Sequence, residues 1–154
     1  MLKIGDKAPD FKLKNNKGEY ISLSDFRKDD VILYFYPKDN TPGCTQEACS
    51  FKNNYNEFKE KKAVVIGINK DDEKSHNKFI KKYGLPFILL SDINKKVCKL
   101  YGTWGKKKFM GVEFEGIIRT TFIIKKGIVK DIIREVSCKT HAEDILKKHY
   151  GVDK

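Results

Sequence analysis

The segment Val31–Cys49 reads VILYFYPKDNTPGCTQEAC, and it decides how the rest of the chain is interpreted. Its opening run is entirely apolar or aromatic and includes β-branched residues, which predicts a buried strand over 31–36. A polar turn follows, and then comes the pattern typical of a helix start. Thr41 can serve as the N-cap, and Pro42 falls where a helix tolerates proline best. The segment thus predicts a strand, a turn and a helix that begins near residue 42.

Cys44 falls in the first turn of this predicted helix. Unpaired backbone N–H groups and the positive end of the helix dipole favour a thiolate at such a position. Open α/β sheets also place their sites at the carboxyl ends of strands, where this cysteine would lie. Many cysteines are instead small buried hydrophobic residues, and spacing alone does not separate the two interpretations. The strand, turn and helix together favour a reactive Cys44.

Length and composition indicate one folded domain, which we expect to span residues 1–154. The chain is 40% hydrophobic and 12% aromatic, as in a globular protein. Residues 1–20 lack the pattern of a signal peptide, and no apolar run reaches membrane-spanning length, so we expect a cytoplasmic protein without membrane contact. Four cysteines in that setting favour redox or catalytic use. The three histidines show no metal spacing with any cysteine, and we expect neither a metal nor another cofactor.

The net charge of +11 raises the question of nucleic-acid binding. All but three of the 32 basic residues are lysines, and they are spread along the whole chain. This distribution is typical of a solvated surface, although weak attraction to polyanions is compatible with it. The densest run, Lys106–Lys108, is expected in a loop and lacks the interleaved aromatic residues that stack on bases. We therefore expect no specific nucleic-acid partner.

Hydrophobic periodicity predicts alternating strands and helices along the rest of the chain. We expect strands at 11–13, 19–23, 31–36, 63–68, 87–90, 117–125 and 128–134, and helices at about 42–60, 72–82, 94–101 and 140–149. This order predicts an α/β fold, a thioredoxin-like sandwich with a central mixed β-sheet and an N-terminal strand extension.

Several motifs give the chain a resemblance to the peroxiredoxins, and in particular to their bacterioferritin comigratory protein, or peroxiredoxin Q, branch. The resemblance covers nearly the whole chain. It rests on Gly5-x-x-Ala8-Pro9-x-Phe11, Pro37-x-x-x-Thr41-x-x-Cys44, Gly43-Cys44-Thr45-x-Glu47-Ala48-Cys49-x-Phe51, Tyr101-Gly102-x-Trp104-Gly105, Gly116-Ile117-x-Arg119-x-Thr121-Phe122 and His141-Ala142-Glu143.

The resemblance implies that Cys44 attacks a hydroperoxide and that Thr41, Pro37 and Arg119 complete the site. Thr41 stands where thioredoxins carry the first cysteine of C-x-x-C, and its hydroxyl would hold the thiolate and a peroxide oxygen together; an ordinary N-cap is the alternative. Pro37 would shield the thiolate, or merely end the strand. Arg119 would face the thiolate from an apolar strand, because a buried arginine needs an anionic partner, or would reach solvent from the strand edge.

The resemblance also implies how Cys44 is regenerated. The Cys44 sulfenic acid would condense with Cys49 into an intramolecular disulfide, which thioredoxin or a similar dithiol would reduce. We expect Cys98 to be a core thiol, with a minor claim to the resolving role, and Cys138 to be a thiol at a strand end. Members of this branch are often monomers, and we expect a monomer, with a dimer as the alternative.

Two functions from different classes follow. The first is a thiol-dependent peroxidase that reduces hydrogen peroxide and alkyl hydroperoxides. The second is a redox-sensing or chaperone-like binding protein that uses the same cysteine as a signal. Repeated turnover with a reductant separates them, because a sensor reacts about once per molecule. A thioredoxin-like disulfide reductase is disfavoured, because C-x-x-C is missing.

Overall fold

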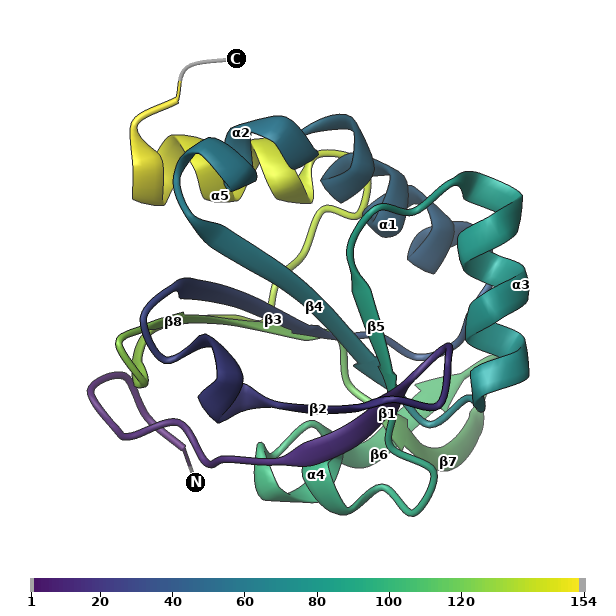
Figure 1. The fold of residues 1–154 in the computed structure, drawn as a ribbon. Helices are drawn as coiled ribbons and strands as arrows, with labels where there is room; N and C mark the ends of the chain where they lie inside the picture. The colour runs from purple at the N-terminus through teal and green to yellow at the C-terminus, as the bar shows by residue number, and fades with distance from the viewer. Residues whose placement is uncertain (1, 153–154) are drawn as a thin grey trace.

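The computed structural model describes residues 2–152 and is built around a seven-stranded mixed sheet (Figure 1). Its strands are β1 Lys12–Asn15, β2 Tyr20–Ser22, β3 Asp30–Phe35, β4 Ala63–Asn69, β5 Ile88–Ser91, β8 Thr120–Lys125 and β9 Ile128–Ile133. They lie in the order β2-β1-β5-β4-β3-β8-β9. Strand β4 pairs in parallel with β3 and β5, whereas β8 and β1 join the sheet in antiparallel orientation. This is the predicted central mixed sheet with its N-terminal strand extension.

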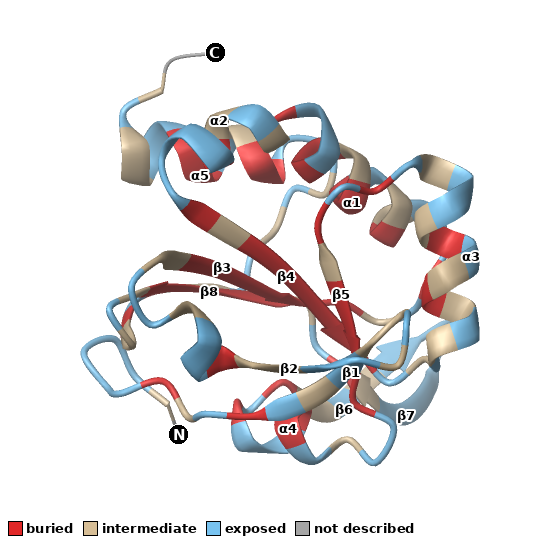
Figure 2. Ribbon diagram, in the orientation of Figure 1, coloured by how far each residue is buried: buried red, intermediate tan, exposed pale blue. Residues whose placement is uncertain are grey.

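Helices cover both faces of the sheet, and the central strands are therefore buried on both sides (Figures 1 and 2). The helical elements are η1 Leu23–Phe26, α1 Pro42–Asn53, α2 Tyr55–Glu60, α3 Glu73–Tyr83, α4 Lys96–Leu100 and α5 His141–Tyr150. Side chains alternate along β3, so Tyr34 and Val31 enter different core clusters. The first cluster includes side chains from α1, α2, α3 and α5, and the second includes side chains from η1, α4 and the N-terminal segment.

The register of β3 with β8 determines where the two ends of these strands meet. Phe35, the last residue of β3, pairs with Thr120, the first residue of β8. The loop that leaves β3 toward α1 and the chain that enters β8 therefore lie at the same edge of the sheet. Residues far apart in the sequence are brought together there.

A hairpin that the sequence analysis did not predict precedes β8. Strands β6 (Trp104–Phe109) and β7 (Val112–Ile117) pair in antiparallel orientation and form a separate two-stranded sheet. The turn at Met110–Gly111 has positive φ at both residues, 51° and 81°, as a two-residue hairpin turn requires. The expectation of a loop at Lys106–Lys108 is wrong, because these lysines pair across the hairpin with the glutamate-rich segment of β7.

Two predicted boundaries also differ from the structure. The helix expected over 42–60 is broken at Asn54, whose buried amide donates to the carbonyl of Ser50 at 2.8 Å and to Glu143 at 2.5 Å. An asparagine side chain that bonds to the backbone in this way competes with helix continuation. The strand expected over 117–125 is interrupted between β7 and β8, so Arg119 lies in a short junction and not within a strand.

None of the helices described in the structure is long and apolar enough to cross a bilayer.

Gly67 is required by the packing at the centre of the sheet. A Cβ atom on this residue of β4 would lie 2.8 Å from Cδ2 of Leu89 and 2.8 Å from Cζ of Tyr34, and both of those side chains are fully buried. We expect Gly67→Ala to lower the free energy of unfolding in urea by about 1–3 kcal/mol through overpacking. Gly116→Ala is the control, since its Cβ would meet the flexible side chain of Lys107 at 3.3 Å and the exposed ring of Phe114 at 3.5 Å. Equal stability of the two variants would contradict this account.

Candidate active site

The site forms where the chain leaves β3, crosses a short loop and enters α1. Thr41 occupies the N-cap position with extended backbone angles (φ −92°, ψ 157°), and Pro42 is the first helical residue, as predicted. Cys44 therefore lies in the first turn of α1, beside backbone N–H groups that have no partner within the helix. Its side chain is only 1% exposed. The thiol is held in a shielded position at the positive end of the helix.

Thr41 does not cap α1 with its side chain. Its hydroxyl donates instead to the carbonyl of Lys38 at 2.8 Å, within the loop. Thr41 is therefore the N-cap residue, as predicted, but its side chain makes no capping hydrogen bond. Pro37 is half-buried in the same loop, directly after Tyr36. Both residues lie in the loop that precedes the turn carrying Cys44.

Arg119 reaches this turn from the junction between β7 and β8. Its Nη2 lies 3.3 Å from Sγ of Cys44, and its Nη1 donates to Oε1 of Glu47 at 2.6 Å. The Arg119 side chain is 21% exposed, so it is largely but not completely shielded from solvent. Burial lowers the pKa of Arg119, but Glu47 and Cys44 outweigh burial and raise it. One planar group therefore holds a carboxylate and the thiol at the same time.

Glu47 is a member of the site that the sequence analysis quoted only as part of a motif. It follows Cys44 by three residues on α1, and side chains at that spacing share a helix face. Its carboxyl is completely buried, and Oε2 has no hydrogen-bond partner among the residues that the structure describes. Burial raises the pKa of Glu47 to about 7, because Arg119 offsets only part of the cost of ionising it.

His141, the first residue of α5, lies next to Glu47. Its Nε2 is 3.7 Å from Oε2 of Glu47 and 2.8 Å from the hydroxyl of Thr121. Burial, helped by Arg119, lowers the pKa of His141 to about 4, so the ring is neutral near pH 7. The neutral ring adds no second positive charge beside Arg119. Sequence patterns could not reveal this contact, because it joins three separate elements.

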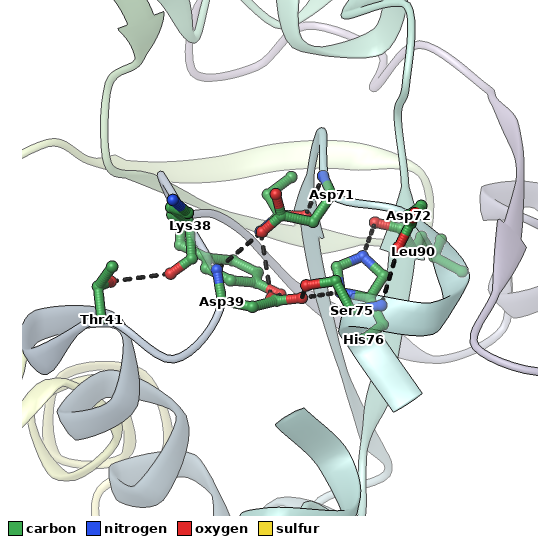
Figure 3. A network of polar contacts seen from close by, with 10 residues as sticks. Lys38, Asp39, Thr41, Asp71, Asp72, Ser75, His76 and Leu90 are labelled. Carbon is green, nitrogen blue, oxygen red and sulfur yellow. Dashed lines mark hydrogen bonds and ion pairs between the residues drawn. The ribbon is translucent and has the colours of Figure 1, made fainter. Parts of the chain in front are cut away.

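The loop between β3 and α1 is held in place by a buried network around Asp39 (Figure 3). The Asp39 carboxylate lies 2.7 Å from Nδ1 of His76 and accepts the hydroxyl of Ser75 at 2.8 Å. It also accepts the hydroxyl of Tyr36 at 2.6 Å. Burial raises the pKa of Asp39, but hydrogen bonding and charge from His76 outweigh burial and lower it. These bonds join the loop to α3.

The far side of this network reaches β5. The other nitrogen of His76, Nε2, lies 3.0 Å from the carbonyl of Leu90. A carbonyl only accepts, so Nε2 carries the hydrogen in this contact. The backbone N–H of Asp39 also donates to Asp71 at 2.8 Å. The start of the loop between β3 and α1 is thus anchored to α3 and β5, a feature that the sequence analysis did not predict.

All four cysteines are free thiols. Two lie on α1, one lies on α4, and one lies in the connection between β9 and α5. Cys49 is half-buried on α1, which runs without interruption past it. Cys98 is fully buried in the second core cluster, on the other face of the sheet, as expected for a core thiol. Cys138 lies in the connection between β9 and α5, where the expected strand does not reach. Its Sγ is close to Gly43, the neighbour of Cys44.

Lys107, on β6, adds positive charge near Cys44 and Arg119. Its ammonium donates to the carbonyl of Ile117 at 2.8 Å. Burial and Arg119 lower the pKa of Lys107, and Cys44 acts in the opposite direction. The unpredicted hairpin therefore contributes a basic group to the surroundings of Cys44.

Known proteins are similar to this chain over most of its length. Residues 4–132 match the AhpC/TSA family. Peroxiredoxin Bcp of Bacillus subtilis is 44% identical over 147 residues, which cover 95% of this chain and 94% of that protein. The crystal structure of a PrxQ cysteine mutant from Xylella fastidiosa has a TM-score of 0.92 and 33% identity, covering 98% of this chain and 97% of that one.

A structure of the bacterioferritin comigratory protein of Xanthomonas campestris, titled for its alkyl peroxide reduction activity, has a TM-score of 0.89 and 30% identity, covering 100% of this chain and 98% of that one. These matches confirm the predicted thioredoxin-like fold. The chain therefore belongs to the AhpC/TSA family, in which it is a peroxiredoxin of the Bcp, or PrxQ, branch and hence a thiol-dependent peroxidase.

Proposed function

We propose that Cys44 is the residue that reduces hydrogen peroxide and alkyl hydroperoxides. The observation that carries this proposal is the contact of 3.3 Å between Arg119 and the Cys44 sulfur at the start of α1. The thiolate attacks one peroxide oxygen, the O–O bond breaks, and water or an alcohol leaves. Cys44 is converted to a sulfenic acid. The alkyl hydroperoxide part of the proposal is supported by the printed title of the Xanthomonas relative.

The rate of this step depends on the charge that moves onto the leaving oxygen. Preorganised donors stabilise such charge most in a shielded site. Arg119 and the backbone N–H of Cys44 are the donors that we assign to this role. The Thr41 hydroxyl joins them when it turns away from the carbonyl of Lys38, to which it donates at 2.8 Å. Pro37 completes the shield and has no N–H group that could compete for the peroxide. Glu47 acts as a positioning residue, because it holds the second arm of the guanidinium at 2.6 Å.

Cys49 is the resolving cysteine in this proposal. Residues five apart on an intact helix are separated by about 7.5 Å along the axis and about 140° around it. Their Cα atoms then lie beyond the limit of about 7 Å for an unstrained disulfide. Because α1 covers both cysteines, its first turns must unwind before the bond forms. The anchored loop around Asp39 and the break at Asn54 bound the segment that would open.

A dithiol reductant then completes the cycle, and thioredoxin is the proposed one. Unwinding of α1 would bring the Cys44–Cys49 disulfide to the surface, where a reductant can attack it. Four free cysteines suit a reducing compartment such as the cytoplasm, and we propose that the enzyme acts there as a monomer.

The direct test of the proposal is Cys44→Ser. We expect this variant to lose peroxide consumption, because a serine hydroxyl is not appreciably ionised near neutral pH. The measurement is steady-state peroxide loss coupled to thioredoxin and thioredoxin reductase. Cys98→Ser is the control and should keep full activity, since Cys98 is buried on the other face of the sheet. Sustained turnover by Cys44→Ser would refute the proposal, and a single turnover by the natural protein would indicate a sensor.

Arg119→Lys tests the two-point contact. Lysine keeps the positive charge but cannot hold the thiolate and Glu47 together. We expect the rate constant for peroxide, measured by stopped flow, to fall by about ten- to a hundredfold, as when one oxyanion donor is removed. Arg27→Lys is the matched control, because Arg27 is exposed and follows η1. An unchanged rate in Arg119→Lys would show that the guanidinium plays no part in the reaction.

Glu47→Gln tests the buried carboxyl through the pH dependence of stability. The pKa of Glu47 is about 7 in the native protein, against about 4.3 in an unfolded chain. The native state therefore binds more protons between these values, and the contribution of Glu47 to the free energy of unfolding falls as pH rises through that window. We subtract the free energy of unfolding of Glu47→Gln from that of the natural protein. This difference should fall by about 2–3 kcal/mol between pH 4.5 and 7 and become nearly constant at higher pH.

His141 is present in both proteins, so its opposite shift cancels in the difference to first order. Glutamine keeps an acceptor for Arg119, which preserves the local packing. A stability difference that stays constant from pH 4.5 to 8 would mean that Glu47 is ionised throughout.

A further inference from the structure

Cys138 lies over the first turn of α1 although it is remote from Cys44 in the sequence. A Cβ atom placed on Gly43 would lie 3.6 Å from Sγ of Cys138 and 3.2 Å from Nη2 of Arg119. The same Nη2 contacts the sulfur of Cys44. Glycine at position 43 leaves the space in which the guanidinium and the Cys138 thiol approach the reacting turn. The Cys138 thiol and the Arg119 guanidinium therefore both lie against Gly43, the residue next to Cys44.

The charges at this place act on both thiols. Burial raises the pKa of Cys138, Arg119 lowers it, and the charges of Glu47 and Cys44 raise it further. While Cys44 is a thiolate, its charge keeps a second thiolate from forming beside it. Conversion of Cys44 to a sulfenic acid removes that charge, whereas Arg119 remains. Peroxide reduction thus makes Cys138 a better nucleophile at the moment when a sulfenic acid is available to attack.

Cys138 also differs from Cys49 in the structural change that it needs to reach Cys44. Cys49 is on the same intact helix as Cys44 and points about 140° away from it around the helix axis. Reaching Cys44 from there breaks helical hydrogen bonds and disturbs a turn that carries the buried Glu47 and Ala48. Cys138 lies in the connection 134–140, in a turn closed by a hydrogen bond from the N–H of Thr140 to the carbonyl of Ser137 at 3.1 Å, and it belongs to no helix or strand. An approach from this connection leaves α1 folded.

We propose that Cys138 is a second resolving cysteine, which condenses with the Cys44 sulfenic acid while α1 remains helical. The Cys138 sulfur attacks the Cys44 sulfur, an S–S bond forms, and the S–O bond breaks. The oxygen leaves as water and takes up the proton that Cys138 loses. The Cys44 sulfur is reduced and the Cys138 sulfur is oxidised, so peroxide is the only oxidant required and a dithiol regenerates both thiols. This inference rests on the proposed role of Cys44.

The experiment compares two variants of the full chain that differ only at residue 138. The first, Cys49→Ser with Cys98→Ser, keeps Cys44 and Cys138 as its cysteines, and the second adds Cys138→Ser. Each protein receives one equivalent of hydrogen peroxide, with dimedone added to trap sulfenic acid, and is then analysed by intact mass and by peptide mapping without reduction. Circular dichroism confirms folding, which we expect to persist because Cys138 is only half-buried.

We expect the first variant to lose two hydrogens and to yield a peptide in which Cys44 is joined to Cys138. The second should accumulate dimedone adduct on Cys44 at a level at least about tenfold higher, because an intramolecular thiol competes at a millimolar or greater effective concentration. Hydrogen exchange gives an independent test. The Cys44–Cys138 form should keep the amides of residues 44–52 protected, whereas a Cys98→Ser, Cys138→Ser protein oxidised through Cys49 should lose that protection.

Three results would overturn the inference. Equal dimedone labelling of the two variants would show that Cys138 does not capture the sulfenic acid, and would leave the proposed peroxidase intact. Loss of protection over 44–52 in the Cys44–Cys138 form would show that this route also requires unwinding. Absence of any oxidation of Cys44 by peroxide in both variants would refute the proposed function and, with it, this inference.

Discussion

The arrangement of the site depends on one guanidinium that binds a thiol and a carboxylate together. Arg119 reaches Cys44 at 3.3 Å and Glu47 at 2.6 Å, and both partners are on α1. A buried carboxylate would be costly without a cation beside it, and a buried cation would be costly without an anion. The contact therefore binds the β7–β8 junction to the helix and stabilises the helical form of the site. Any event that removes charge from Cys44 weakens one arm of this contact.

The segments before and after Cys44 have opposite structural requirements in the proposed cycle: the loop must stay rigid, and the helix must be able to unwind. In this cycle the loop before the helix keeps its shape and positions the peroxide, and the network of Asp39 with Ser75 and His76 holds this loop to α3 and β5. The helix after it must open if Cys49 is to resolve the sulfenic acid. The break at Asn54 limits how far such opening can spread, because α2 begins as a separate helix there. A rigid loop and a helix that can be unwound are thus joined at Thr41.

Much of this arrangement could be predicted from local sequence. A strand at 31–36, a helix start at Pro42 and a shielded cysteine in its first turn depend on hydrophobic runs, proline tolerance and helix geometry within one short segment. The hairpin β6–β7 was missed because three consecutive lysines were interpreted as a loop, whereas cross-strand pairing with glutamates supports a strand. Thr41 was correctly placed, but its hydroxyl bonds to Lys38 and not to the helix, a choice between equally local partners.

The sequence by itself determined the segment to which we assign the chemistry, because the strand, turn and helix around Cys44 are each specified by neighbouring residues. Only the tertiary structure decided what surrounds the sulfur. Arg119 meets Cys44 because β8 pairs with β3 in a register that puts Thr120 opposite Phe35, so the residue before β8 lies beyond the end of β3. Cys138 reaches the same turn because β9 and α5 follow that pairing. Such contacts join residues that are distant in the chain, and they exist only once sheet register has fixed which ends of the strands coincide.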